Sequence, residues 1–280
     1  DAVADEQAAI RQALRHPIGS APLKDVVQAG DTVAIVVSDI TRLVHTAQML
    51  PIIVDELNQA GVKDDQITVV TAQGTHRAHT PEEDAIVCGA DMVKRVKIVS
   101  HDCRDASQLT KIGTTTYGND VYLNSHVVQA DKVILTGAVS FHPMAGFGGG
   151  RKAVLPGVAS YETIMRNHAM ALTETFGGGC NPKCETSLLE DNPLHDDMKQ
   201  AAALLNPCFL VNTVFSADGD LYEVVGGHWY EAWKKGCDDL LHIASVPIQD
   251  LADITIASAG GYPKDMNLYQ SMKAPMNAVF

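Results

Sequence analysis

The chain has 280 residues, 46% of them hydrophobic and 20% charged, which is enough for one large or two ordinary globular domains with a real core. Its formal net charge of −13 at pH 7 argues against non-specific nucleic-acid binding, although a local arginine and lysine cluster can still bind a small anion. No apolar run approaches the roughly 20 residues of a membrane span and no signal peptide is visible, so no membrane association is expected.

Helical and strand patterns alternate through the first half of the chain. Amphipathic helices are expected at Glu6–Arg15, at Ala47–Gln59 and after Thr80, where a proline and acidic residues follow. Buried strands are expected at Thr32–Val37, Ile67–Thr71, Val96–Ser100 and Lys132–Thr136, and a short strand pair within Tyr117–Val128. The alternation predicts an α/β fold, with a parallel-rich sheet, right-handed crossovers and helices on both faces.

The second half continues the alternation, with a break near Pro247. Helices are expected at Pro156–Ala171, toward the end of Leu189–Leu205 and at His228–His242, and strands at Phe209–Val214 and Leu221–Val225. Beyond Pro247, a strand at Ala252–Ala257 should lead to a helix that carries Tyr269, Gln270 and Lys273. We therefore expect an N-terminal α/β domain over residues 1–247 and the beginning of a second α/β domain over residues 248–280.

Polar residues follow three of the expected strands. Asp39, Thr41 and Arg42 follow the first strand, His76 follows the second, and His142 follows the strand at 132–136. Ligands of such sheets lie beyond the carboxyl ends of the strands, so these residues are expected to converge. Arg42 either holds a carboxylate or phosphate in bidentate fashion or forms only a surface ion pair. A lone histidine is more often structural, but His76 and His142 together suit a pair of acid/base histidines.

The segment from Phe141 to Lys152 is rich in glycine. Glycine lets the backbone approach a ligand closely, and lysine binds anions or forms covalent bonds, which favours a bound cofactor over simple packing. The segment is not a P-loop, because Arg151 stands where that motif needs glycine, and the same residue ends the dinucleotide pattern that begins at Gly146. The alternative is a flexible glycine turn with two solvated cations.

His168 lies in an expected helix, where it either interacts with the helix dipole or ligates a metal. The six cysteines contain no CxxC pair, so we expect thiols in a reducing compartment and a cytoplasmic location. Cys180 and Cys184 lie in a loop rich in glycine and are a weaker candidate for a metal site. The other histidines are interpreted as structural: His16, His45, His79, His101, His126, His195, His228 and His242.

Together these clusters resemble the lactate racemase family that uses the nickel-pincer nucleotide cofactor. The resemblance runs from about Asp31 to Lys273 and rests on the joint occurrence, in this order, of several short clusters. They are Ser38-Asp39-Ile40-Thr41-Arg42, Gly74-Thr75-His76, the segment Phe141–Lys152, Leu155-Pro156-Gly157, Asn167-His168, and Tyr269-Gln270 with Lys273.

The resemblance implies a cofactor and a role for each candidate residue. The cofactor is a pyridinium-3-thioamide-5-thiocarboxylic acid mononucleotide, whose two sulfur-bearing arms hold nickel together with a ring carbon. Lys152 is implied to be joined to it through a thioamide, and His168 to ligate the nickel. His76 and His142 are implied to transfer protons on opposite faces of the substrate. The remaining implied contacts are Asp39, Thr41 and Tyr269 in the cofactor pocket, and Arg42, Gln270 and Lys273 on the substrate.

The implied reaction is racemisation or epimerisation of a 2-hydroxy acid such as lactate by reversible hydride transfer. The implied partners are a small anionic 2-hydroxy acid and the enzymes that synthesise the cofactor. The family continues past the position that matches Phe280 with a second domain that closes over the site, of which this chain is expected to carry only the start. A non-catalytic nucleotide- or metal-binding module is a second possibility, against which the paired histidines argue. A zinc-dependent hydrolase is a third, but the sequence has no HExxH motif.

Overall fold

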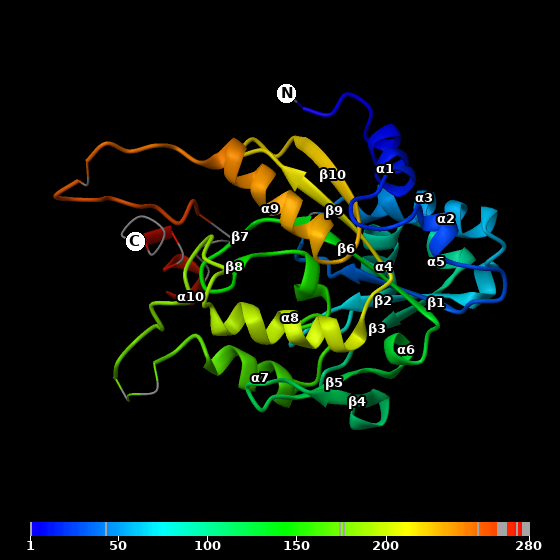
Figure 1. Cartoon of the computed structure of the whole chain (residues 1–280), viewed down its shortest axis with the longest axis horizontal. Coiled ribbons are helices and arrows are strands. Elements are labelled where there is room, and N and C mark those ends of the chain that lie inside the picture. Colours follow the sequence, from blue (N-terminus) through cyan, green and yellow to red (C-terminus); the bar gives the residue numbers. More distant parts are fainter. Residues whose placement is uncertain are drawn as a thin grey trace.

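The computed structural model describes residues 2–42, 44–173, 175, 177–250, 252–261, 268–272 and 274–275. Its largest sheet has six strands in the order β10-β9-β6-β1-β2-β3 (Figure 1). Their bounds are β1 Val33–Ser38, β2 Ile67–Ala72, β3 Lys97–Ser100, β6 Lys132–Val139, β9 Phe209–Phe215 and β10 Leu221–Gly227. All neighbours pair in parallel except β10, which joins the edge antiparallel to β9, so the predicted parallel-rich sheet is confirmed.

The central strands are buried on both faces, which explains their continuous apolar sequences. In β1, Val33 and Ile35 belong to one core cluster, whereas Ala34 and Val36 belong to the other. The first face is covered by α1 (Glu6–Arg15), α2 (Leu23–Val26), α3 (Thr46–Gln59), α4 (Pro81–Cys88) and α5 (Met92–Arg95). The second is covered by α6 (Ser125–Val128), α7 (Tyr161–Ala169), α8 (Pro193–Leu205) and α9 (Glu231–Ala244) (Figure 1). Helices on both faces are therefore confirmed.

The order of the strands places one topological switch point at the centre of the sheet. The chain runs from β1 outward to β2 and β3, and then returns to form β6 on the other side of β1. The carboxyl ends of β1 and β6 therefore flank the point where the winding direction changes. In open α/β sheets this point is where ligands bind.

Among the elements whose observed bounds differ from the predicted ones, two are informative. The strand pair expected within 117–128 is formed by β4 (Leu109–Thr114) and β5 (Asp120–Asn124), and Ser125–Val128 is helical because the Asn124 side chain caps it. The helix expected from Pro156 begins only at Tyr161, where the Ser160 hydroxyl accepts from the Thr163 N–H. The remaining short elements are β7 (Phe141–His142), β8 (Gly146–Phe147) and the 3₁₀ turns Asp64–Gln66, Ala106–Gln108 and Gly150–Ala153.

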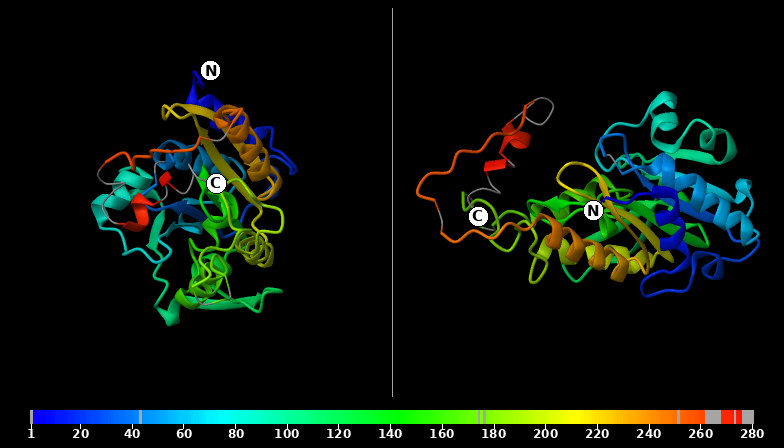
Figure 2. Two further views of the ribbon diagram at one scale, coloured as in Figure 1. Left: turned by 90° about the vertical axis from the view of Figure 1, so that its left-hand side faces the viewer. Right: turned by 90° about the horizontal axis from the view of Figure 1, so that it is seen from above.

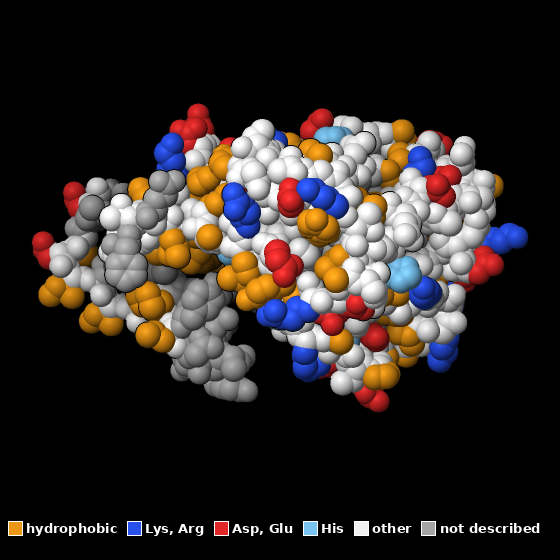
Figure 3. All heavy atoms as spheres, turned by 90° about the horizontal axis from the view of Figure 1, so that it is seen from below, with side chains coloured by type: hydrophobic (Ala, Val, Ile, Leu, Met, Phe, Trp, Pro, Cys, Tyr) orange, Lys and Arg blue, Asp and Glu red, His pale blue; other side chains and the backbone are white. Residues whose placement is uncertain are grey.

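The segment after α9 runs out from the body of the protein (Figures 1 and 2). The strand expected at Ala252–Ala257 is wrong, because these residues have no regular structure and no strand lies beside them in the described part of the chain. Ile254 and Ile256 are 81% and 94% exposed, and hydrophobic side chains gather at this end in Figure 3. A short helix, α10 (Leu268–Ser271), follows. A second domain over 248–280 stays a prediction.

Candidate functional site

The first part of the candidate site is a carboxylate–imidazole pair that joins the ends of β1 and β2. Asp39 follows β1 and is only 4% exposed; its Oδ1 accepts from the Thr41 hydroxyl at 2.6 Å. Its Oδ2 lies 2.5 Å from Nδ1 of His76, whose side chain is half exposed. A carboxylate only accepts, so Nδ1 carries the proton and the neutral ring has its lone pair on Nε2. His76 is thus oriented as a proton acceptor at Nε2.

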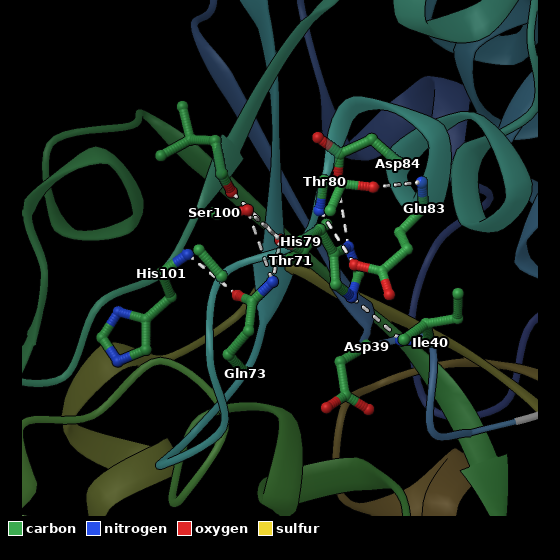
Figure 4. A network of polar contacts seen from close by, with 12 residues as sticks. Asp39, Ile40, Thr71, Gln73, His79, Thr80, Glu83, Asp84, Ser100 and His101 are labelled. Atoms are coloured by element: carbon green, nitrogen blue, oxygen red, sulfur yellow. Dashed lines mark hydrogen bonds and ion pairs between the residues drawn. The ribbon is translucent and has the colours of Figure 1, made fainter.

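A second histidine holds the β1 loop against the β2 loop but does not face the site. The buried ring of His79 accepts from the Ile40 N–H at 3.0 Å and donates to Asp84, also at 3.0 Å. Figure 4 shows this bridge, with the Asp39 side chain turned away from His79. The structural interpretation of His79 is consistent with these contacts, because both ring nitrogens serve to position the loop that carries Asp39.

His142 lies on β7, directly after β6, and forms a local turn. Its Nδ1 accepts from the backbone N–H groups of Met144 and Ala145, at 3.2 and 3.0 Å. The intervening Pro143 has no N–H and suits the start of such a turn. His142 and His76 thus follow strands on either side of β1, and each has its Nδ1 engaged by the protein.

The buried side chain of Arg151 holds the glycine segment in place through hydrogen bonds and is not a solvated cation. Its buried guanidinium donates to the carbonyls of Ala145 and Phe147 at 2.6 and 2.8 Å and to Nδ1 of His195 at 3.0 Å. It also lies 4.1 Å from the ring centroid of Trp233, whose Nε1 donates to the Gly148 carbonyl at 2.8 Å. The alternative of a flexible turn with two solvated cations is therefore wrong for Arg151.

Two of the glycines are required by packing, whatever the segment binds. Gly149 has a φ of 67°, and a Cβ there would lie 2.7 Å from the Ala138 carbonyl oxygen. Gly150 has a φ of 54°, and its Cβ would lie 2.4 Å from the Trp233 ring. Packing therefore accounts for glycine at these two positions, and the approach of the segment to a cofactor stays a prediction.

Lys152 lies in the 3₁₀ turn at Gly150–Ala153, and its backbone is tied to the loop after β2. The Lys152 carbonyl accepts from the Gly157 N–H at 3.0 Å, and the Gly157 carbonyl accepts from the Gly74 N–H at 2.9 Å. Gly74 lies two residues before His76, so two clusters that are distant in sequence share one hydrogen-bonded backbone. The glycine segment thus lies against the loop that follows β2, a link that the sequence analysis did not predict.

His168 lies in the last turn of α7 and is the second candidate for contact with the cofactor. Its Nδ1 donates to the Ile164 carbonyl at 3.0 Å, which leaves the lone pair of the neutral ring on Nε2. Burial lowers the pKa of His168, and the nearby charge of Lys152 lowers it further. The ring is therefore neutral at pH 7, the form that ligates metals, and Lys152 is its electrostatic neighbour.

A buried carboxylate that the sequence analysis missed holds the helix of His168. Asp197 of α8 accepts from the side chains of Thr115, Asn119 and Asn167 at 2.6, 2.8 and 2.9 Å. Asn167 directly precedes His168, and its Oδ1 is buried without a hydrogen bond. The signal was present in the sequence, because Asp197 lies on the apolar stripe of its helix, beside Leu194.

The structure does not place every predicted residue in this site. Thr41 and Arg42 lie in the exposed turn after Asp39. Lys273 and the side chains of Tyr269 and Gln270 lie outside the part of the chain that the structure describes. Their predicted contacts with cofactor or substrate stay predictions.

The described residues offer little support for a metal site built from protein ligands alone. Among them, no group of three or more histidine, cysteine, aspartate or glutamate side chains is arranged to hold a metal ion, so the zinc-dependent hydrolase has no ligand cluster in this part. All six cysteines are free thiols, and Cys180 is exposed whereas Cys184 is buried. In the same described residues, no helix is both long and apolar enough to span a membrane.

Comparisons with family models and with curated proteins point to the same family. A model of the lactate racemase N-terminal domain matches residues 1–177. Lactate racemases of Thermoanaerobacterium thermosaccharolyticum and Lactiplantibacillus plantarum are 36% and 37% identical over 268 residues, which is 96% of this chain but 61% of each relative. The chain thus spans about three fifths of the length of these curated relatives.

Solved structures agree with this result. The lactate racemase apoprotein of Thermoanaerobacterium thermosaccharolyticum matches with a TM-score of 0.85 and 33% identity, covering 96% of this chain and 63% of that one. A Thermotoga maritima protein shares the fold at 22% identity, with a TM-score of 0.67 over 85% of this chain and 59% of that one. The chain belongs to the lactate racemase N-terminal domain family.

Proposed function

We propose that this chain carries the cofactor-attachment and proton-transfer residues of a 2-hydroxy acid racemase or epimerase with a lactate-like substrate. The observation that carries the proposal is the imidazole of His168, which burial and the charge of Lys152 keep neutral and whose Nδ1 is engaged by Ile164. A neutral ring that senses the charge of Lys152 fits a nickel-pincer nucleotide that would be joined to Lys152 and ligated through Nε2 of His168. In such a cofactor the other nickel ligands come from the nucleotide, so a single protein imidazole suffices.

When bound, the cofactor supplies an acceptor and donor for the substrate hydride. The chain's own residues then have two tasks, to orient the substrate and to move its hydroxyl proton. Arg42 is proposed to hold the carboxylate, and His76, fixed by Asp39, to take the hydroxyl proton at Nε2. Loss of hydride and proton gives a planar 2-keto acid, so hydride can return to either face. His142 is proposed to serve the opposite face.

The remaining assignments follow from family membership and are proposals as well. Thr41 and Tyr269 are proposed to line the cofactor pocket, and Gln270 and Lys273 to assist in binding the substrate. The enzymes that synthesise the cofactor are the proposed partners, and the cytoplasm is the proposed location. The second domain expected from residue 248 onward is proposed to close over the switch point at the ends of β1 and β6.

The cofactor is tested by mass rather than by turnover. The protein is produced with and without the cofactor-synthesis enzymes, and intact mass and nickel content are measured. We expect a nickel-bearing adduct only in the first sample, its loss in Lys152→Ala, and its retention in Lys183→Ala, a matched change of an exposed lysine. An unmodified Lys152 in the fully supplied host would refute the cofactor assignment.

The reaction is tested separately on loaded protein. Enantiopure 2-hydroxy acids are incubated with it and the products are separated by chiral chromatography. His142→Ala should abolish interconversion while leaving the adduct in place, and full activity of this variant would refute a role in proton transfer. A complete adduct without interconversion of any tested acid would favour the alternative, a non-catalytic nucleotide-binding module.

A further inference from the structure

The two candidate proton-transfer histidines have opposite hydrogen-bonding environments at the same ring atom. Nδ1 of His76 faces a carboxylate oxygen of Asp39, which can only accept. Nδ1 of His142 faces the N–H groups of Met144 and Ala145, which can only donate. A neutral imidazole carries one proton, and these partners determine on which nitrogen it lies.

We propose that His76 and His142 rest in opposite neutral tautomers, so that His76 presents a lone pair at Nε2 and His142 presents an N–H at Nε2. This inference rests on the proposed function, because it assigns different roles in proton transfer to two residues of that proposed site. His76 is the resting proton acceptor for the substrate hydroxyl. His142 is the resting hydrogen-bond donor to the substrate oxygen, although both are histidines at strand ends.

The two arrangements also differ in how they accommodate a second proton. When His76 takes the hydroxyl proton at Nε2, the resulting imidazolium stays paired with the Asp39 carboxylate through Nδ1–H. If His142 is to accept a proton at Nε2, its first proton must occupy Nδ1, where it would confront two N–H donors. The hydrogen bonds from the Met144 and Ala145 N–H groups to His142 Nδ1 must therefore break before His142 serves as a base.

The local sequence explains why the Nδ1 environments of His76 and His142 differ. Asp39 is buried and fixed by Thr41, so it presents an oxygen to His76 in every state of the ring. The donors to His142 are backbone groups two and three residues further along the same turn, which follows Pro143. Neither environment depends on a bound ligand, so the tautomers should be present in the cofactor-free protein.

The test is nitrogen NMR of protein labelled with ¹⁵N-histidine, recorded without cofactor at alkaline pH, where imidazole rings are neutral. His76→Gln and His142→Gln identify the two signal sets. We expect a protonated Nδ1 and unprotonated Nε2 for His76, and the reverse for His142. The same tautomer in both rings, or a protonated Nδ1 in His142, would overturn the proposal.

Asp39→Asn tests the positioning role of the carboxylate. Its amide nitrogen can donate to Nδ1, so the His76 signals should shift toward the Nε2–H tautomer while those of His142 stay unchanged. Asp84→Asn is the matched control, because it alters the carboxylate beside His79 and should leave the signals of His76 and His142 unchanged. Unaltered His76 signals in Asp39→Asn would contradict control by this carboxylate.

Racemisation by loaded protein gives the functional arm of the test. Asp39→Asn should lower turnover by up to about 10⁴-fold, the loss caused in a serine-protease triad when an amide replaces the carboxylate that fixes the tautomer of the catalytic histidine. Loading is checked by intact mass, so loss of the adduct is distinguished from loss of the base. If wild-type protein carries no adduct, the proposed function fails while the NMR result stands. If Asp39→Asn is loaded and fully active, the division of roles fails.

Discussion

Cζ of Arg151 lies 4.1 Å from the ring centroid of Trp233, so the segment before Lys152 is joined to α9 by a stacked cation. The groups that accept from this guanidinium are two backbone carbonyls and the imidazole of His195, none of which is negatively charged. Burial lowers the pKa of Arg151 to about 10, which still leaves it charged at neutral pH. A buried cation held by neutral groups therefore fixes the backbone that presents Lys152.

Arg151→Met should destabilise the protein substantially. The substitution keeps an apolar stem against Trp233 but leaves the carbonyls of Ala145 and Phe147 without their buried donor. We expect the free energy of unfolding to fall by about 2–4 kcal/mol, measured by urea denaturation of cofactor-free protein. Lys94→Met is the control, because Lys94 is exposed and paired with an exposed Asp91. This variant should change the free energy of unfolding by less than about 0.5 kcal/mol. Equal losses in the two variants would contradict a structural role for Arg151.

Gly150→Ala should cost more than its backbone conformation alone explains. Gly150 has a φ of 54° and faces the Trp233 ring, whereas Gly219 has a φ of 89° and nothing within 4 Å of an added Cβ. Gly219→Ala therefore measures the conformational cost alone, about 1 kcal/mol. Gly150→Ala adds the displacement of a packed ring, a further 1–3 kcal/mol or so. Thermal and urea denaturation of both variants check this, and similar losses would show that Trp233 moves aside at no cost.

The sequence was sufficient for the elements that depend on local patterns. β1, β2 and β6 are short apolar runs ended by polar residues, and the amphipathic stretch Glu6–Arg15 predicts the observed bounds of α1. The pairing of Asp39 with His76 could also be expected, since parallel strands bring their carboxyl ends to one edge. Local signals and one topological rule thus account for this pair.

Two of the missed features depend on contacts between distant residues. From the sequence alone, Arg151 is interpreted as a surface cation. In the structure it is buried against Trp233 and His195, which come from two other helices. The strand expected at Ala252–Ala257 has the right composition but needs a neighbouring strand, because a strand's backbone groups pair with another chain segment. Residue type and spacing do not report such partners, so these interpretations could not be made from sequence.

The pH dependence of stability should contain a contribution from His195. Burial, followed by the charges of Arg151 and Lys199, lowers the pKa of His195 to about 3 from its ordinary 6.5. Between these values the unfolded chain binds a proton that the folded protein does not. The free energy of unfolding should therefore fall as pH falls below about 6.5, by up to about 1.4 kcal/mol per pH unit.

His195→Gln separates this contribution from that of the carboxylates. Glutamine does not titrate and keeps an oxygen acceptor for Arg151, so the variant should lose less stability than the wild type between pH 7.5 and pH 5. Urea denaturation across this range measures the two slopes. His242→Gln, which changes an exposed histidine on α9, should retain the wild-type slope. Parallel curves for His195→Gln and the wild type would mean that His195 has the same pKa in the folded and the unfolded protein, which would contradict the lowered pKa.

Asp197→Ala should loosen the helix that carries His168. The change removes the acceptor shared by Thr115, Asn119 and Asn167 and leaves three buried donors unsatisfied, so we expect a loss of about 3–5 kcal/mol in the free energy of unfolding. Because Asn167 directly precedes His168, nickel retention by loaded protein should fall as well.

Asp196→Ala is the matched control on the same helix. Asp196 is only partly buried, and its hydrogen bond to the Tyr117 hydroxyl is 3.4 Å long, so its removal should cost less than about 1 kcal/mol. Urea denaturation of both variants, together with nickel analysis after dialysis, compares the two carboxylates. If Asp197→Ala is destabilised but keeps its nickel, the network supports the fold without positioning His168. If both variants behave alike, the buried carboxylate has no special role, because its three donors find other acceptors.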